Sequence, residues 1–154
     1  MVKTGKRLTL CGILLTGILI FIWGNSAMPG ETSGALSGWV GALLSKIAPF
    51  LSTENGLHFL RKAAHFSEFA ALGMILSWLF GMLLRRWPWP CLLPVLCGAT
   101  AACIDETIQI FSPGRYSSMT DVLIDCSGVV TGILIFYIIF YILRHFRCKK
   151  AAGA

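Results

Sequence analysis

The sequence predicts an all-α fold, a polytopic membrane helix bundle with about four transmembrane helices and one short outer amphipathic helix. Of the 154 residues, 56% are hydrophobic and only 13% are charged, which is too apolar for an ordinary soluble domain. Three segments reach the roughly 20 apolar residues that a span needs, namely 63–84, 91–111 and 122–143. A shorter apolar segment, 8–23, precedes them. We therefore expect one integral membrane domain over residues 1–154.

Segment 8–23 has two interpretations. It is either the first transmembrane helix or the apolar part of a signal peptide, with Lys3, Lys6 and Arg7 as the charged region before it. The sequence Asn25-Ser26-Ala27 would then be the cleavage site. Because 16 apolar residues are long for a signal peptide and Asn25 suits the site poorly, a retained span is favoured.

The connection from the first to the second segment, about 37 residues, is too long for a simple loop. Apolar residues recur in it at helical spacing, and they are Leu36, Val40, Leu43, Leu44, Ile47, Phe50 and Leu51. This pattern predicts a short amphipathic helix lying on the outer leaflet. The helix either caps the bundle, which is favoured, or acts as a lid over polar residues. The Asn55-Gly56 pair indicates the turn into the second span.

Basic residues predict the orientation. With the N-terminus inside, nine lysines and arginines fall on the cytoplasmic side, and four fall outside: Lys46, Arg61, Lys62 and Arg115. The positive-inside rule then favours four spans with both the N- and C-termini cytoplasmic. Since the basic residues lie at span ends and form no patch with interleaved aromatics, the bilayer and not nucleic acid is the expected partner.

Five of the seven acidic residues lie in or at the ends of the apolar segments. Ionised groups at membrane depth are costly, so they indicate a functional site. In the predicted orientation they come to one level at the outer leaflet, together with four other polar side chains. The candidate ligand-binding residues are Lys62, His65, Glu68, Asp105, Glu106, Gln109, Arg115, Asp121 and Asp125.

Helical spacing refines the expected arrangement. Lys62, His65 and Glu68 are three residues apart and form one slanted stripe. Asp105 and Gln109 share a face. Glu106 is rotated by about 100° from Asp105, so the two should not share a partner.

The chemistry of these residues leaves several interpretations open. His65 and Glu68, with Asp105 and either Asp121 or Asp125, would suit a divalent cation such as Zn, Mn or Fe, whereas carboxylates alone would suit Mg or Ca. Alternatively, these residues form a purely structural network of salt bridges and hydrogen bonds, in which Lys62 and Arg115 neutralise the acids. His65, Glu68 and Asp105 are also the candidates for catalysis.

Other motifs carry less information. The six cysteines include no C-x-x-C pair and are expected to pack as small apolar residues. No G-x-S-x-G or H-E-x-x-H motif is present. Gly128 and Gly132 form a G-x-x-x-G step, which favours close helix contact inside the bundle over a dimer.

Three stretches resemble the VanZ-like membrane proteins. They are KAAHFSEFAALG at 62–73, DETIQIFSPGR at 105–115 and DVLIDCSG at 121–128, within a motif core of 61–132. The one departure is Asp125, where Asn is expected in many members. The resemblance implies a multi-span protein of the bacterial cell membrane, and the family's namesake is associated with low-level teicoplanin resistance.

Two functions from different classes follow. In the first, the protein binds a lipid-linked precursor or a glycopeptide in the cell envelope and alters its access, in association with antibiotic resistance. In the second, it is a membrane-embedded enzyme that modifies a lipid-linked or surface-lipid substrate. Glu68 or an aspartate would then be the general base, with His65 as its acid–base partner or as a metal ligand.

Overall fold

The computed structural model describes residues 2–46, 48–84 and 86–152, and no strand occurs among them. Its helices are α1 (Val2–Ala27), α2 (Gly30–Leu44), a 3₁₀ turn η1 (Pro49–Ser52), α3 (Glu54–Leu83), α4 (Trp89–Ile110) and α5 (Met119–Ala152). Within this described part, four stretches are long and apolar enough to cross a membrane: Gly5–Ala27, Glu54–Leu83, Trp89–Ile110 and Met119–Phe146. The predicted all-α bundle of four spans is therefore confirmed.

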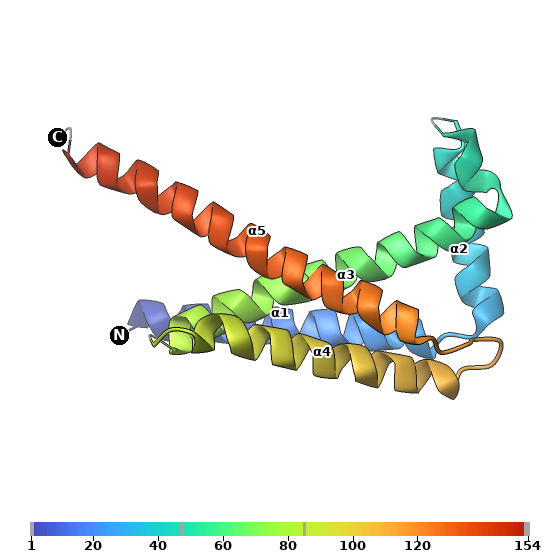
Figure 1. Cartoon of the computed structure of the whole chain (residues 1–154), viewed down its shortest axis with the longest axis horizontal. Coiled ribbons are helices and arrows are strands. Elements are labelled where there is room, and N and C mark those ends of the chain that lie inside the picture. The colour runs from blue at the N-terminus through green and yellow to red at the C-terminus, as the bar shows by residue number, and fades with distance from the viewer. Residues whose placement is uncertain (1, 47, 85, 153–154) are drawn as a thin grey trace.

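The helices run alternately along the bundle (Figure 1). The start of α1 and the end of α5 lie at one end, whereas α2, the start of α3 and the α4–α5 connection lie at the other. At a rise of about 1.5 Å per residue, the 22 residues of α4 are about 33 Å long, which matches the apolar thickness of a bilayer. Because an even number of spans returns the chain to the side from which it started, this arrangement agrees with N- and C-termini on the same side of the membrane.

Helices α3 and α5 cross in the middle of the bundle (Figure 1) and approach closely at glycines. A Cβ atom at Gly128 or Gly132 would overlap the backbone of Phe66 or Ala70 in α3. Since small residues let two backbones approach in a membrane, these glycines position the crossing. The prediction that the G-x-x-x-G step makes contacts inside the bundle is confirmed.

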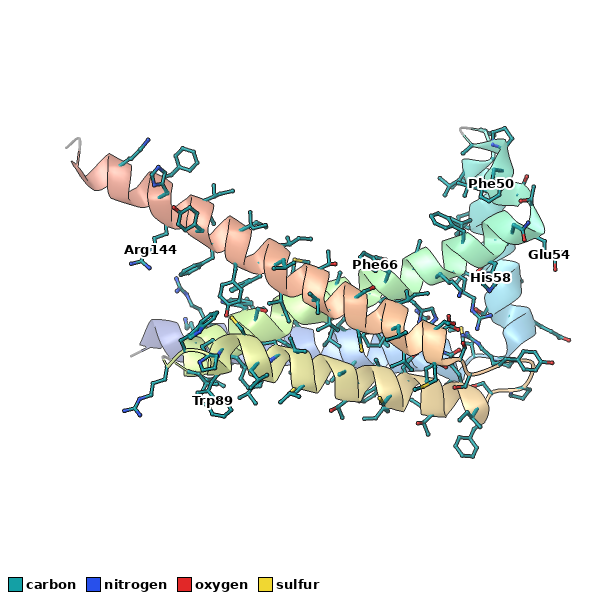
Figure 2. The ribbon with its side chains drawn as sticks, viewed as in Figure 1. Phe50, Glu54, His58, Phe66, Trp89 and Arg144 are labelled. Carbon is teal, nitrogen blue, oxygen red and sulfur yellow. The ribbon has the colours of Figure 1, made fainter. Side chains whose placement is uncertain are left out.

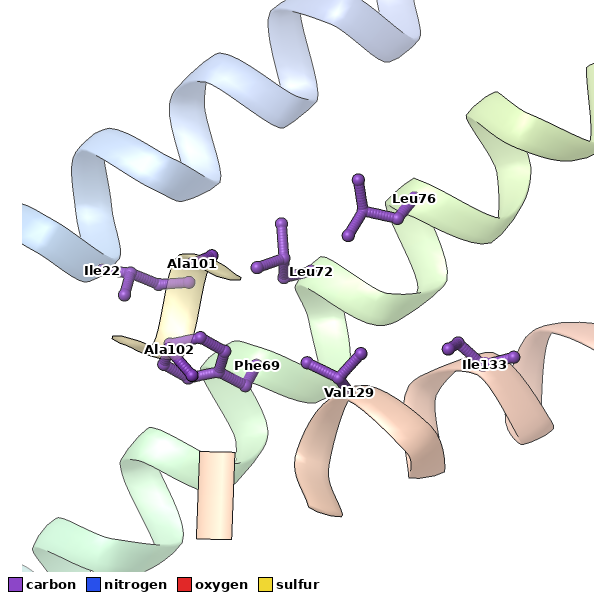
Figure 3. Close-up of a cluster of buried hydrophobic side chains, with 8 residues drawn as sticks. All are labelled: Ile22, Phe69, Leu72, Leu76, Ala101, Ala102, Val129 and Ile133. Carbon is purple, nitrogen blue, oxygen red and sulfur yellow. The ribbon is translucent and has the colours of Figure 1, made fainter. Parts of the chain in front are cut away.

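The apolar core lies around this crossing and includes all four spans (Figure 3). Its buried members are Ile22 from α1, Phe69, Leu72 and Leu76 from α3, Ala101 and Ala102 from α4, and Val129 and Ile133 from α5. Because α1 contributes a fully buried side chain, it packs as part of the bundle, which supports the interpretation of this segment as a span.

The connection from α1 to α3 differs from the prediction in its helix boundaries. The helix begins at Gly30 and ends at Leu44, before Pro49, whose ring cannot continue a helix. Helix α2 crosses the end of the bundle steeply (Figure 1), as a helix in the membrane plane would. Its buried residue is Gly41, and Leu36 and Leu43 are more than half exposed. Ile47 lies outside the described residues.

The expected turn at Asn55-Gly56 is wrong. Helix α3 already begins at Glu54, and its N-cap is Thr53, whose hydroxyl accepts a hydrogen bond from the Gly56 amide at 3.2 Å. Gly56 is buried against the backbone of Phe50 and Leu51. The glycine is therefore needed for close packing in the first helical turn and not for a reversal of the chain.

Candidate functional site

Polar side chains of four helices and the α4–α5 connection gather at the end of the bundle that holds α2. Figure 2 shows the nitrogen and oxygen atoms concentrated beside the start of α5, near the labelled His58. All nine predicted ligand-binding residues belong to this region, which we call the polar cluster. They are Lys62, His65, Glu68, Asp105, Glu106, Gln109, Arg115, Asp121 and Asp125.

His65 lies at the centre of the polar cluster. Its Nδ1 atom is 3.7 Å from Asp105 Oδ2 and 3.7 Å from Asp125 Oδ1. These separations are longer than hydrogen bonds. Both aspartates are fully buried, and an unpaired carboxylate at such a position costs on the order of several kcal/mol. The three donor atoms, one from each helix, lie within 4.8 Å of one another, so these residues could hold a metal ion.

Asp105 is positioned by two neighbours. The Ser26 hydroxyl donates to Asp105 Oδ2 at 2.8 Å, and Gln109 Nε2 donates to the same oxygen at 3.0 Å. Gln109 Nε2 also lies 3.0 Å from Glu106 Oε1. The expectation that Asp105 and Glu106 do not share a partner is therefore wrong. Gln109 follows them by four and three residues, and its amide reaches both carboxylates from one face of α4.

Glu106 also connects α4 to the start of α5. Its second oxygen, Oε2, accepts a hydrogen bond from the Ser118 backbone amide at 2.9 Å. Met119 begins α5, so this contact fixes the chain one residue before that helix. Glu106 thus points away from His65 and toward the α4–α5 connection, as the rotation between adjacent helical positions predicts.

Glu68 contacts α1 and not the aspartates. The Asn25 side-chain amide donates to Glu68 Oε1 at 3.1 Å. Its second oxygen, Oε2, is buried without a hydrogen-bond partner among the described residues. The sequence analysis considered Asn25 and Ser26 only as parts of a cleavage site and missed this role. Their position directly after an apolar segment, at the same outer level, is the signal that identifies them.

The two basic residues expected to neutralise the acids differ in role. Lys62 Nζ lies 3.1 Å from Asp121 Oδ1, and both side chains are about one-third exposed. Arg115 instead donates to two backbone carbonyls at the end of α1: its Nη2 reaches Asn25 O in the last turn at 2.7 Å, and its Nε reaches Met28 O, just after the helix, at 3.2 Å. Arg115 thus makes its hydrogen bonds to carbonyls at the end of a helix, where they lack helical partners, while its charge still acts on Asp105, Glu106 and Glu68.

The chain around Arg115 is held in a tight reversal. Gly114 has a φ of 73°, which glycine adopts without strain. The Pro113 carbonyl accepts a hydrogen bond from the Gly30 amide at 2.9 Å, which ties this turn to the start of α2. Burial and the nearby Arg61 charge lower the pKa of the Arg115 guanidinium from its ordinary value, but arginine stays protonated.

Two cavities open onto the polar cluster. The first, of about 390 Å³, is lined mostly by polar residues of α3, α5 and the α4–α5 connection, among them Lys62, Tyr116 and Asp121. The second, of about 370 Å³, lies between α2 and α3 and has apolar walls that include Leu36 and Val40. Arg61 and His65 line both cavities. A polar and an apolar space therefore meet at these two residues.

The cysteines take no part in this arrangement. The five whose side chains the structure describes are free, and none belongs to the group of His65, Asp105 and Asp125. Cys11 is buried, as expected for a small packing residue, whereas Cys97 and Cys103 are exposed. The side chain of Cys148 lies outside the described part.

Comparison with known proteins identifies the family. The model of the VanZ/LLP1 family matches residues 11–141, which include most of each of the four spans and every residue of the polar cluster. No curated protein and no solved structure shows significant similarity to the chain. Because the family match extends over most of the sequence, this membrane protein belongs to the VanZ/LLP1 family.

Proposed function

We propose that this protein binds a lipid-linked molecule of the bacterial envelope in the polar cluster, at the outer leaflet of the cell membrane. The observation that carries the proposal is the meeting of the two cavities at Arg61 and His65. An amphiphile needs a polar space for its headgroup and an adjoining apolar space for its chain. By binding such a precursor, or a glycopeptide itself, the protein contributes to teicoplanin-type resistance or to envelope modification.

The charge of the polar cluster restricts the headgroup. Five acids, Glu68, Asp105, Glu106, Asp121 and Asp125, outnumber the three bases Arg61, Lys62 and Arg115. A bare phosphate is therefore a poor ligand, because the acids would repel it. A cationic group, or a phosphate bridged by a metal ion, fits the site better.

The outer location rests on the nine-to-four distribution of basic residues. It is tested by labelling single cysteines with a membrane-impermeant reagent in a cysteine-free background. Tyr116 in the α4–α5 connection and Trp87 before α4 are 89% and 77% exposed. We expect Tyr116→Cys to be labelled in intact cells and Trp87→Cys only after lysis. The reverse pattern would put the polar cluster on the cytoplasmic side.

A second candidate is a membrane-embedded enzyme that modifies a lipid-linked substrate. It is supported by two buried atoms without hydrogen-bond partners in the described part of the chain, His65 Nδ1 and Glu68 Oε2. Both residues line the apolar cavity. Glu68 or Asp105 would act as general base and His65 as its acid–base partner. An enzyme leaves a chemically changed lipid, whereas a binding protein does not.

The proposal is tested with Glu68→Gln, a near-isostere that keeps the packing. Cells that lack the gene are complemented with wild type, Glu68→Gln, His65→Asn or Asp105→Asn. The measurements are teicoplanin susceptibility, the profile of lipids and cell-wall precursors, and the amount and melting temperature of the protein. Glu54→Gln is the matched control, because Glu54 is at the exposed start of the same helix.

If the polar cluster binds or reacts with a ligand, we expect the three cluster variants to lose the phenotype to a similar extent, since residues that act as a unit lose function non-additively. The amount and the melting temperature of each variant protein should stay near normal. Stable variants that all keep full activity would overturn the proposal. A new lipid species that depends on Glu68 would select the enzyme over the binding protein.

A further inference from the structure

Three potential metal ligands meet where α3, α4 and α5 come together. His65 Nδ1 is 3.7 Å from one oxygen of Asp105 and 3.7 Å from one oxygen of Asp125. One donor atom from each residue lies within 4.8 Å of the other two. Each helix thus contributes one ligand to a common point.

The hydrogen bonding of these atoms is incomplete. Asp125 is fully buried, and neither of its carboxylate oxygens has a hydrogen-bond partner among the described residues. The same is true of His65 Nδ1 and of Asp105 Oδ1. Buried polar groups are nearly always hydrogen-bonded, so several unpartnered atoms that face one point are typical of a site that binds a ligand.

Among the described residues His65 is the ion-pair partner of the two aspartates, and the Arg115 charge acts on Asp105 only from farther away. Lys62 is the ion-pair partner of Asp121, and Arg115 donates to backbone carbonyls. In the described part of the chain, the one basic side chain found within 4 Å of a carboxylate oxygen of Asp105 and of Asp125 is that of His65. A divalent cation at this point would neutralise both carboxylates.

The spacing agrees with coordination. Ligand atoms at about 2.0–2.2 Å from a zinc ion lie about 3.3–3.6 Å from one another in tetrahedral geometry. The two 3.7 Å separations from His65 need only a small contraction around the ion, and the donor atoms of Asp105 and Asp125, which lie within 4.8 Å, would move closer together. Ser26 and Gln109 already orient Asp105 through its Oδ2 atom, as outer-shell partners of metal ligands do.

We propose that His65, Asp105 and Asp125 bind one divalent transition-metal ion, of the Zn, Mn or Fe type. One imidazole and two carboxylates form a mixed donor set that suits these ions better than Mg or Ca. Three protein ligands leave coordination positions open, and His65 and Asp125 both line the polar cavity. An oxygen of a bound phosphate or hydroxyl group could take such a position.

The ion site is independent of the proposed function, because it is tested by metal binding and not by a phenotype. The full-length protein, purified in detergent, is stripped with EDTA and loaded separately with Zn²⁺, Mn²⁺ or Fe²⁺. Bound metal per chain is then measured by elemental analysis, and the melting temperature is recorded at increasing metal concentration. Mn²⁺ is included because it binds thiolates poorly, so exposed cysteines such as Cys97 contribute little to its count.

We expect about one ion per chain and a melting temperature that rises with metal concentration, since an ion that binds only the folded state stabilises it. Asp125→Asn and His65→Asn should weaken binding at least tenfold. His145→Asn is the matched control for His65→Asn, because His145 is exposed near the end of α5 and lies outside the polar cluster. This control should bind metal like the wild type.

Two results would overturn the proposal. One is a wild-type protein that holds no stoichiometric ion of any of the three metals and shows no metal-dependent melting temperature. The other is equal binding by wild type, Asp125→Asn and His65→Asn. The wild-type measurements decide the question alone if both variants fail to fold. Loss of metal binding without loss of the phenotype would separate this site from the proposed function.

Discussion

The two halves of the bundle are stabilised by different contacts. Around the α3–α5 crossing, apolar side chains such as Leu72 and Val129 are buried, and glycines bring the helix backbones together. At the end that holds the polar cluster, Asp105, Glu106 and Asp125 are buried instead. Side chains from α1 and α4 supply the hydrogen bonds there, and several buried oxygens have none.

This difference supports the proposed functional role of the polar cluster. Replacement of buried charged groups by well-packed apolar residues is often neutral or stabilising. A bundle selected for stability alone would therefore continue the apolar core to its end. The polar cluster does the opposite at a position where three spans converge, which favours the proposed site over a purely structural role.

The largest effect is expected at the crossing. Gly132→Ala puts a methyl group against the Ala70 carbonyl of α3, and overpacking of this kind costs about 1–3 kcal/mol. We expect the upper part of this range, because the overlap is with backbone and the helices must separate. The measurement is reversible unfolding in detergent, with the fraction of folded protein in the membrane as a second readout.

Gly17→Ala is the control for that experiment, since a Cβ atom at Gly17 in α1 meets no atom within 4 Å. It should leave stability unchanged or raise it slightly through the better helix propensity of alanine. If both variants were equally stable, the close approach of α3 and α5 would not be what holds this half together.

A smaller effect is expected in the polar cluster. Ser26→Ala removes the 2.8 Å hydrogen bond to Asp105 and leaves a buried carboxylate less well satisfied, which costs about 1–3 kcal/mol. We expect the lower part of that range, because Gln109 still donates to the same oxygen. Ser127→Ala is the control, because its exposed hydroxyl bonds only to a carbonyl of its own helix. Equal stability of the two variants would contradict the assigned role of Ser26.

The sequence was sufficient to predict the four spans and the members of the polar cluster. Apolar length determines a span, and charged residues such as Glu68 and Asp125 are conspicuous within apolar segments. Helical spacing also placed Glu106 on a different side of α4 from Asp105. These are local properties of single helices, and they do not depend on how the helices pack.

The contacts between helices could not be predicted in this way. The pairing of Asn25 with Glu68 depends on how far α1 is displaced along α3, and no local pattern encodes that displacement. Arg115 was assigned to the acids by charge alone, whereas its position beside the end of α1 gives it carbonyl partners. The contact of Gln109 with both Asp105 and Glu106, by contrast, lies within α4 and follows from local spacing, because residues three and four positions apart share a helix face.

The smallest effect is expected at the ion pair of Lys62 and Asp121. This pair tests whether the partly exposed residues of the polar cluster differ in energy from its buried residues. Both side chains are about one-third exposed, and solvent-exposed pairs contribute about 0.2–1 kcal/mol. A double-mutant cycle of Lys62→Met and Asp121→Asn should give a coupling energy in that range, and added salt should reduce it. A coupling of several kcal/mol would mean that this pair is as desolvated as Asp105 and Asp125. The desolvated interior of the polar cluster would then include Lys62 and Asp121.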